Sequence, residues 1–240
     1  MRFVRLAVPM TALALLSACQ SGQAREAGAE TTRTFPAGNF TKLAIAGPYD
    51  VTVSTGSQPG VQATGGQNRL DEMVVEVQGD TLQIHPRERS GGNWSWKDDR
   101  GVKVSVTVPA LSDLAMAGSG DVSVNRIAGE SFGAALAGSG ELKLEDIQAR
   151  QFALRVAGSG DVSARGTVGA IRLSVAGSGT VDAANLVSDT ANVAVMGSGD
   201  VRLQAKQSAN VSVAGSGDVE IKGGAKCTVS KAGSGDVRCS

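Results

Sequence analysis

The chain has 240 residues, and its 23 Lys and Arg residues balance its 23 Asp and Glu residues. This balance argues against a nucleic-acid-binding protein, which normally carries a surplus of basic residues. Aromatic residues make up only 3% of the chain and His85 is its one histidine. The core must therefore be aliphatic, and most histidine-based metal and catalytic sites are excluded.

The first 19 residues have the layout of a bacterial export signal. Arg2 and Arg5 precede an apolar run over residues 6–16, and the segment ends in Leu16-Ser17-Ala18-Cys19. The run is too short for a membrane-spanning helix, which needs roughly 20 residues, but it suits the core of a signal peptide. The last four residues resemble the lipobox of bacterial lipoproteins. The alternative is an ordinary signal peptide with an incidental cysteine.

The lipobox resemblance implies that Cys19 is lipidated and becomes the first residue after cleavage. Several acyl chains on one cysteine would hold the protein on a membrane. Gln20, the next residue, favours an outer-membrane lipoprotein of the cell envelope, facing either the periplasm or the cell surface. Residues 20–35 are small and polar, so we expect them to form a flexible tether between the lipid and the folded domain.

Residues 36–110 are predicted to form an irregular N-terminal β region. Residues 43–53 look like a degenerate form of the repeat that follows, with Pro48-Tyr49 at its corner, and residues 73–77, 81–85 and 102–108 also read as strands. Between the last two lies a charged, glycine-rich loop that carries Trp94 and Trp96. These two side chains either fold back over the domain or contact a ligand such as a sugar, because exposed aromatic residues often mark a contact surface.

Gly-Ser-Gly repeats dominate the chain from residue 111 onward. The tripeptide occurs seven times, with first glycines at positions 118, 138, 158, 177, 197, 215 and 233. On both sides of it apolar and polar residues alternate, which is the pattern of strands whose side chains point to opposite faces. Glycine gives the backbone the freedom to turn a sharp corner. Each repeat is therefore predicted to contain two short strands joined by a turn.

The apolar residues of the repeats form columns four and two residues before the first glycine and four residues after it, and only Lys231 breaks them. One unit cannot bury its own apolar side, whereas stacked units share a continuous core. We therefore predict an all-β fold in which residues 111–240 form a parallel β-solenoid, or β-helix, of about seven coils. The single 19-residue spacing should be absorbed near residues 166–169. The alternative is an antiparallel meander with a hairpin at each tripeptide.

Several segments together resemble a known bacterial family. These are residues 40–53, residues 82–85, residues 104–109 and the array of Ala-Gly-Ser-Gly-Asp corners. They are similar to the GIN domain, which is described as the head of an auto-transporter adhesin. The resemblance covers about residues 37–239 and implies a β-helical, exported protein, often a lipoprotein, with an adhesin-like role and no family catalytic residues.

Acidic side chains follow six of the seven tripeptides. At coil spacing these side chains would repel one another, and calcium could relieve the repulsion because it prefers carboxylate and carbonyl oxygens. The other interpretation is that each carboxylate accepts hydrogen bonds from turn amides and that no cofactor is present. The residues of this weak metal candidate are Asp121, Glu141, Asp161, Asp200, Asp218 and Asp236.

Cys227 and Cys239 lie at equal distances before and after the last corner, at Gly233. An exported protein meets an oxidising compartment, and these are the two thiols that remain after lipidation. We expect a disulfide that closes the last coil. The serines of the corners have no general base beside them in the sequence, so we assign them to the turns and expect no catalytic residues.

Three functions are consistent with these features. The first is a lipid-anchored envelope protein with a β-helical, adhesin-like head that binds a glycan, a protein or a second copy of itself. The second is a structural or stress-related envelope lipoprotein without a specific ligand. The third is a polysaccharide-acting β-helix enzyme, which would need a groove with clustered Asp, Lys, Arg or His side chains. We favour the first and do not expect an enzyme.

Overall fold

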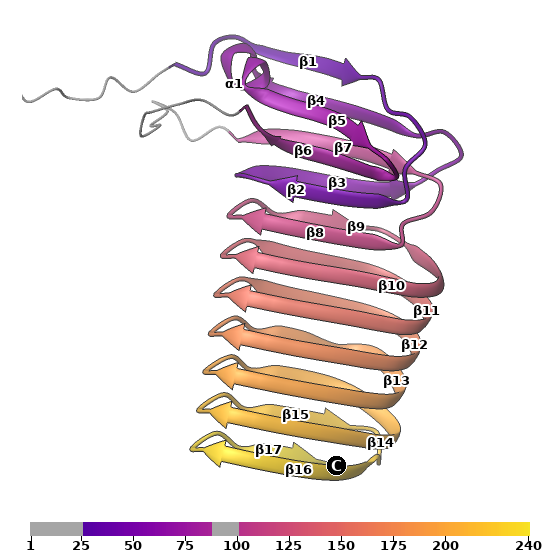
Figure 1. Cartoon of the computed structure of the whole chain (residues 1–240), viewed down its shortest axis with the longest axis vertical. Helices are drawn as coiled ribbons and strands as arrows, with labels where there is room; N and C mark the ends of the chain where they lie inside the picture. Colours follow the sequence, from indigo (N-terminus) through magenta and orange to yellow (C-terminus); the bar gives the residue numbers. More distant parts are fainter. Residues whose placement is uncertain (1–25, 88–100) are drawn as a thin grey trace, which may run out of the picture.

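The computed structural model describes residues 26–87 and 101–240. Figure 1 shows them as a rod of stacked coils with a cap at its N-terminal end. The predicted signal peptide with Cys19 and the predicted loop positions Trp94 and Trp96 lie outside the described residues. Within the described ranges, no helix has the length and apolar character needed to cross a membrane.

Strands account for most of the described chain. The N-terminal elements are β1 (Glu30–Phe35), β2 (Lys42–Ala46), β3 (Tyr49–Thr55), β4 (Gly60–Gly66), the short helix α1 (Gln67–Asp71), β5 (Met73–Gln78), β6 (Thr81–Pro86) and β7 (Val102–Val108). The repeats form β8 (Asp113–Gly118), β9 (Val122–Val124), β10 (Ile127–Gly138), β11 (Glu141–Gly158), β12 (Asp161–Gly177), β13 (Val181–Gly197), β14 (Val201–Gly215), β15 (Val219–Lys222), β16 (Lys226–Gly233) and β17 (Val237–Cys239).

The repeats stack in parallel. Gly138 pairs with Gly158, Gly158 with Gly177 and Gly177 with Gly197, so the corners lie in a column along one edge of the rod. Each Gly-Ser-Gly carries the chain to the opposite wall of the same coil, and each strand bonds to the equivalent strand one coil away. The predicted parallel β-solenoid is confirmed, and the antiparallel meander is wrong.

The parallel stack continues into the N-terminal region in an order that differs from the sequence. β2 and β3 lie against β8 and β9, and β6 and β7 lie against the other side of β2 and β3. Gly47 occupies the corner column, since a Cβ added to Gly118 would lie 2.5 Å from its carbonyl oxygen. Residues 43–53 are therefore a degenerate coil, as the sequence predicts.

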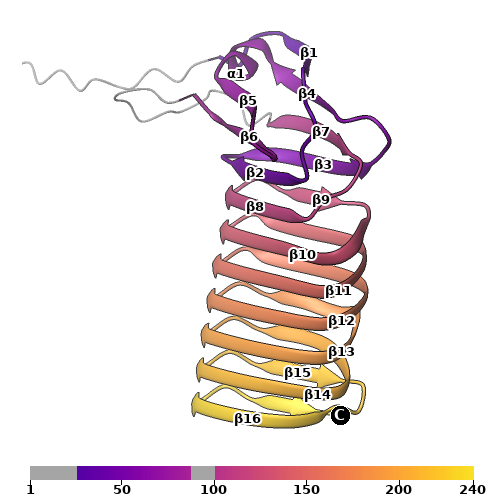
Figure 2. The ribbon, with the colours of Figure 1, turned by 45° about the vertical axis from the view of Figure 1, so that its right-hand side comes forward.

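Antiparallel strands and a helix cap the N-terminal end. β4 runs antiparallel to β7 and β1, and β5 runs antiparallel to β6. The predicted flexible tether is therefore wrong over residues 30–35, which form β1 and pair with β4 along their whole length. Helix α1 connects β4 to β5 and buries Leu70 completely. β16 and β17 are the last strands at the C-terminal end, and Figure 2 shows no comparable layer of the described chain over it.

The predicted apolar columns form the core. Their members up to the sixth repeat are at most 3% exposed: Leu114, Ala134, Leu154, Leu173, Val193, Val211, Met116, Leu136, Val156, Val175, Val195, Val213, Val122, Leu142, Val162, Val181, Val201 and Val219. In the last coil Val229 belongs to the same columns but is 46% exposed. Burial of aliphatic side chains along the whole rod supplies its main stabilisation.

Unequal repeat lengths are absorbed away from the Gly-Ser-Gly corners. Leu144 pairs with Ala164 and Ile147 with Gly166, so the shorter spacing is taken up there, next to the predicted residues 166–169. A later shift lies between β13 and β14, where Ser188 Oγ donates a hydrogen bond to the carbonyl oxygen of Gln204 over 2.8 Å. Corners and core columns therefore stay in register while the opposite bend varies.

Candidate functional site

Neighbouring corners are packed so tightly that two positions in each of them require glycine. Gly177 has a φ of +132°, and a Cβ added to it would lie 2.1 Å from the carbonyl oxygen of Gly158. A Cβ on Gly179 would approach the carbonyl oxygen of Gly160 to the same distance. Ser178, between the two glycines, is exposed, and so are the six other corner serines. The corners thus present a row of hydroxyl groups along one edge, at the spacing of the strands.

The acidic residues after the corners bind backbone amides of the next coil. The carboxylate Oδ1 of Asp200 accepts a hydrogen bond from the Asp218 N–H over 2.9 Å, and Asp218 accepts one from the Asp236 N–H over 2.8 Å. Asp161 binds the Thr180 N–H in the same way. Among the described residues, no three His, Cys, Asp or Glu side chains are grouped as a metal site. Four of the six acidic residues, Asp121, Asp161, Asp200 and Asp218, therefore make the amide hydrogen bonds of one of the two interpretations.

One broad surface of the rod is acidic. We call it the acidic face and define it as the outward-facing residues three, five and seven positions after the first glycine of each corner. Its basic side chains are engaged in ion pairs, which are Lys143–Glu141 at 2.7 Å, Arg165–Glu145 at 3.6 Å, Arg202–Glu220 at 3.9 Å, Lys222–Glu220 at 3.2 Å and Arg238–Asp236 at 3.4 Å. The hydrogen bond to Glu141 raises the pKa of Lys143.

The opposite broad surface carries small side chains. We call it the small-residue face and define it as the outward-facing residues one, three, five and seven positions before each corner in β8, β10–β14 and β16. Its positions next to the corner are Ala117, Ala137, Ala157, Ala176, Met196, Ala214 and Ala232. Only Met196 among them is large, and it is 57% exposed.

A groove of about 530 Å³ lies on the small-residue face. It crosses β11, β12, β13, β14 and β16, so it follows the long axis of the rod over about 19 Å. Small side chains such as Ala153, Ser174 and Ala194 line its partly buried floor. Among the residues that the structure describes, its charged side chains are Arg155 and Arg172, and no carboxylate or histidine lines it.

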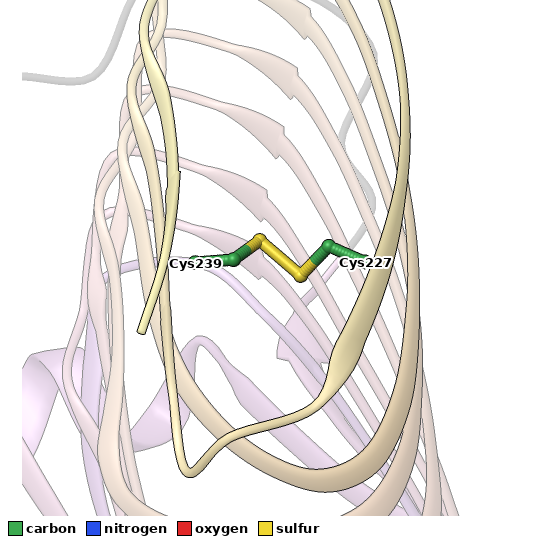
Figure 3. Close-up of a disulfide and its surroundings, with 2 residues drawn as sticks. All are labelled: Cys227 and Cys239. Carbon is green, nitrogen blue, oxygen red and sulfur yellow. A yellow bond between two sulfur atoms is a disulfide. The ribbon is translucent and has the colours of Figure 1, made fainter.

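A disulfide links Cys227 and Cys239 in the last coil. Figure 3 looks along the rod and shows the bond crossing from one wall of this coil to the other. The bridge joins β16 to β17 and lies next to the exposed end of the core, where Cys227 and Val237 are only partly buried. The end of the solenoid is thus held by a covalent bond instead of a covering layer.

The structure brings some of the sequence-predicted site residues together and does not describe others. The acidic column forms one ladder and the cysteines meet in the last coil, whereas Cys19, Trp94 and Trp96 cannot be placed because they lie outside the described residues. Sequence reasoning missed the groove and its two arginines. A signal for them was present in the alternation of apolar and polar residues before the corners. At its outward positions, Arg155 and Arg172 interrupt a series of small uncharged residues.

Fold and surface together define a capped parallel β-solenoid that displays long ladders of side chains on two faces of unlike charge. The chain belongs to the family described as “Putative auto-transporter adhesin, head GIN domain”, whose model matches residues 39–225. The resemblance stated from the sequence is thereby confirmed, and the family description is that of an adhesin-like envelope protein. No curated protein matches the chain.

Solved structures share this fold. A “putative adhesin” from Bacteroides fragilis NCTC 9343 is 21% identical, with a TM-score of 0.81 over 90% of this chain and 99% of its own. A “putative lipid binding protein” from Parabacteroides distasonis ATCC 8503 is 24% identical, with a TM-score of 0.74 over 91% of this chain and 100% of its own. At these identities the likeness establishes the fold alone.

Proposed function

We propose that this protein is a lipid-anchored component of the bacterial cell envelope and that its solenoid binds a ligand without transforming it. Support for the anchor comes from Leu16-Ser17-Ala18-Cys19, which resembles a lipobox. Support for binding comes from membership in a family described as an adhesin head.

The groove on the small-residue face is the observation that carries the binding role. It is long, open and lined by short polar and methyl-bearing side chains at a constant spacing, which suits an extended ligand that lies along the rod. General acid-base catalysis would require a titratable side chain beside the bound substrate. Among the described residues, no carboxylate, histidine or lysine lines the groove, and its charged side chains are two guanidinium groups.

The lipid anchor is tested by fractionating cells that express the Cys19→Ser variant. We expect this variant to leave the membrane fraction, because the acyl chains have no attachment site without the cysteine thiol. Cys227→Ser is the matched control and should stay with the membrane. Equal distribution of the Cys19→Ser variant and the wild type would contradict the anchor.

The side of the membrane is tested by protease treatment of intact cells and of cells with a permeabilised outer membrane. Loss of the solenoid from intact cells would support adhesion to an external surface. Protection until permeabilisation would rule out external adhesion and direct the search to partners within the envelope. Binding itself is measured with the purified, labelled chain on whole cells, envelope fractions and glycan arrays, and no binding to any of them would contradict the binding role.

A further inference from the structure

We propose that the groove on the small-residue face binds an acidic polysaccharide, with Arg155 and Arg172 holding its carboxylate or sulfate groups. This inference rests on the proposed binding function and names the ligand class of the same face.

The distribution of charge over the rod favours an anionic ligand at this face. The outward positions that define it carry Arg155, Arg172 and Lys226 against a single acid, Asp113. Asp113 lies on β8, three strands from Arg172 on β12, which corresponds to roughly 14 Å. The acidic face has the opposite balance, so an anion approaching the rod is directed to the groove.

The two arginines are neighbours without an acidic partner. Arg155 pairs in register with Ser174, which lies two residues along β12 from Arg172. Among the residues that the structure describes, no carboxylate lies within ion-pair distance of either guanidinium. Arg172 Nη1 donates only a long hydrogen bond, of 3.4 Å, to Gln151 Oε1. Two adjacent cations repel each other, and a bound anion removes this cost by bidentate hydrogen bonding to the guanidinium groups.

The rest of the groove suits the hydroxyl groups and carbon faces of sugars. Asn192, Asn210 and Thr228 form one outward ladder, and Asn210 Nδ2 donates to Asn192 Oδ1 over 3.1 Å. Amides and hydroxyls both donate and accept hydrogen bonds, as sugar hydroxyls do. The methyl groups of Ala153 and Ala194 supply apolar contact between these polar groups. A linear polymer along the rod would meet the same kinds of group on successive strands.

Other anionic partners fit this place less well. An extended acidic peptide would bind by adding a strand to a sheet edge. The strands β12 and β13 under the groove are hydrogen-bonded on both sides, so they offer no free edge. Side chains alone must therefore recognise the ligand. An anionic membrane attracts clusters of four to eight basic residues, and the groove holds two. A flexible polyanion of sugars requires neither a free edge nor a large basic patch.

The test is calorimetry of the full chain, with its disulfide intact, against polygalacturonate, hyaluronan, chondroitin sulfate and heparin. Fully methyl-esterified polygalacturonate serves as the uncharged counterpart of the first polymer. We expect at least one acidic polymer to bind, its uncharged counterpart to bind far more weakly, and added salt to weaken the interaction.

Two groups of variants locate the site. Arg155→Gln and Arg172→Gln should each weaken binding by about tenfold, because each removes a charge-assisted contact. Asn192→Asp should weaken it further by adding a negative charge to the groove. Arg165→Gln and Arg202→Gln are matched controls on the acidic face and should bind like the wild type.

Each contrary result has a separate meaning. If an acidic polymer binds but Arg155→Gln and Arg172→Gln bind equally well, the inference about the groove is overturned. If no acidic polymer binds at up to about 1 mM while a neutral glycan or an envelope protein does, the ligand class is wrong and the proposed binding function stands. If no glycan, cell or envelope fraction binds, the proposed function fails together with the inference.

Discussion

The two glycines of a corner are required for different physical reasons. Gly177 combines a positive φ, which side chains disfavour, with a close approach to the Gly158 carbonyl oxygen. Gly179 lacks the positive φ and is constrained by its approach to the Gly160 carbonyl oxygen alone. Ser178 has neither constraint, since its side chain is exposed. The recurrence of the two glycines therefore reflects the stacking distance between coils.

Replacement of a corner glycine should destabilise the solenoid strongly. We expect Gly177→Ala to lower the free energy of unfolding by about 3 kcal/mol or more, because the added methyl group collides with backbone atoms of the preceding coil. The measurement is urea denaturation followed by circular dichroism. Ser178→Ala is the control and should change stability by no more than about 0.5 kcal/mol. Similar effects of the two substitutions would show that the corner is not close-packed.

The acidic ladder predicts a difference between two substitutions of Asp200. Its Oδ1 accepts the Asp218 N–H, so Asp200→Ala should cost about 1 kcal/mol, the usual contribution of one hydrogen bond. Asp200→Asn keeps an acceptor oxygen and relieves repulsion along the column, so it should cost much less. Urea denaturation of both variants checks the prediction. If both lost the same stability, the carboxylate charge rather than its hydrogen bond would be the stabilising feature.

Tyr49 allows the pH dependence of one buried group to be followed directly. Burial, with a smaller effect of the Glu72 charge, raises its pKa to about 12. A folded-state pKa above the unfolded value of about 10 means that the phenol stabilises the fold at lower pH and that this contribution is lost between about pH 10 and pH 12. Tyr49 is the only tyrosine in the chain, so the absorbance of its phenolate reports this group alone. Titration near pH 10 in the folded protein would contradict the prediction.

At the scale of the elements, the coils could be predicted from the sequence because the same residue type is required at the same position of every repeat. Alternation places Val156 and Val175 inward, and Gly158 and Gly177 recur where the coils touch. The degenerate coil at residues 43–53 was recognisable for the same reason.

The order of the N-terminal coils could not be predicted in this way. β6 and β7 stack on the far side of β2 and β3, although they follow them in the chain. Their alternating pattern would be the same at any level of the rod. The level that they occupy depends on long-range strand pairing and on the cap. The groove was missed because it depends on outward residues from five strands, and no single segment contains its pattern.

The last coil is the element whose stability depends most on a covalent bond. Among the described strands, β16 pairs with β14 and β17 pairs with β15 of the coil before, and both are mostly exposed. Removing the bridge with Cys227→Ser and Cys239→Ser frees a segment of 12 residues, which corresponds to about 3 kcal/mol of chain entropy. We expect faster hydrogen exchange in β16 and β17 and little change in β11–β13, because the units of a solenoid are coupled mainly to their neighbours.

Hydrogen exchange with mass spectrometry measures this effect strand by strand. Adding reductant to the wild type should reproduce the behaviour of the double variant, and adding it to the variant should have no further effect on these strands. Uniformly faster exchange along the rod would instead show that the disulfide stabilises the whole solenoid as one cooperative unit.

The whole molecule is asymmetric along its axis, because one end is capped and the other leaves strand edges accessible. Unpaired edges of this kind can recruit a second copy, and inward-pointing lysines are one way in which proteins prevent it. Lys231 is such a residue, since it occupies the core column of Val213 in the last coil. Stacking of a second copy would take its ammonium group out of water without a partner, which is strongly unfavourable. We therefore expect the wild type to resist end-to-end association.

Lys231→Val should remove this barrier and promote association through the C-terminal end. The substitution completes an apolar surface with Val229, which is already 46% exposed, beside the free edges of β16 and β17. Sedimentation velocity over a range of concentrations should show dimers or longer rods of this variant while the wild type stays monomeric. Lys226→Val is the matched control, because it removes a lysine from the same strand but on the outward side. Equal association of both variants would mean that general surface hydrophobicity drives it, and association of the wild type would show that Lys231 does not protect the end.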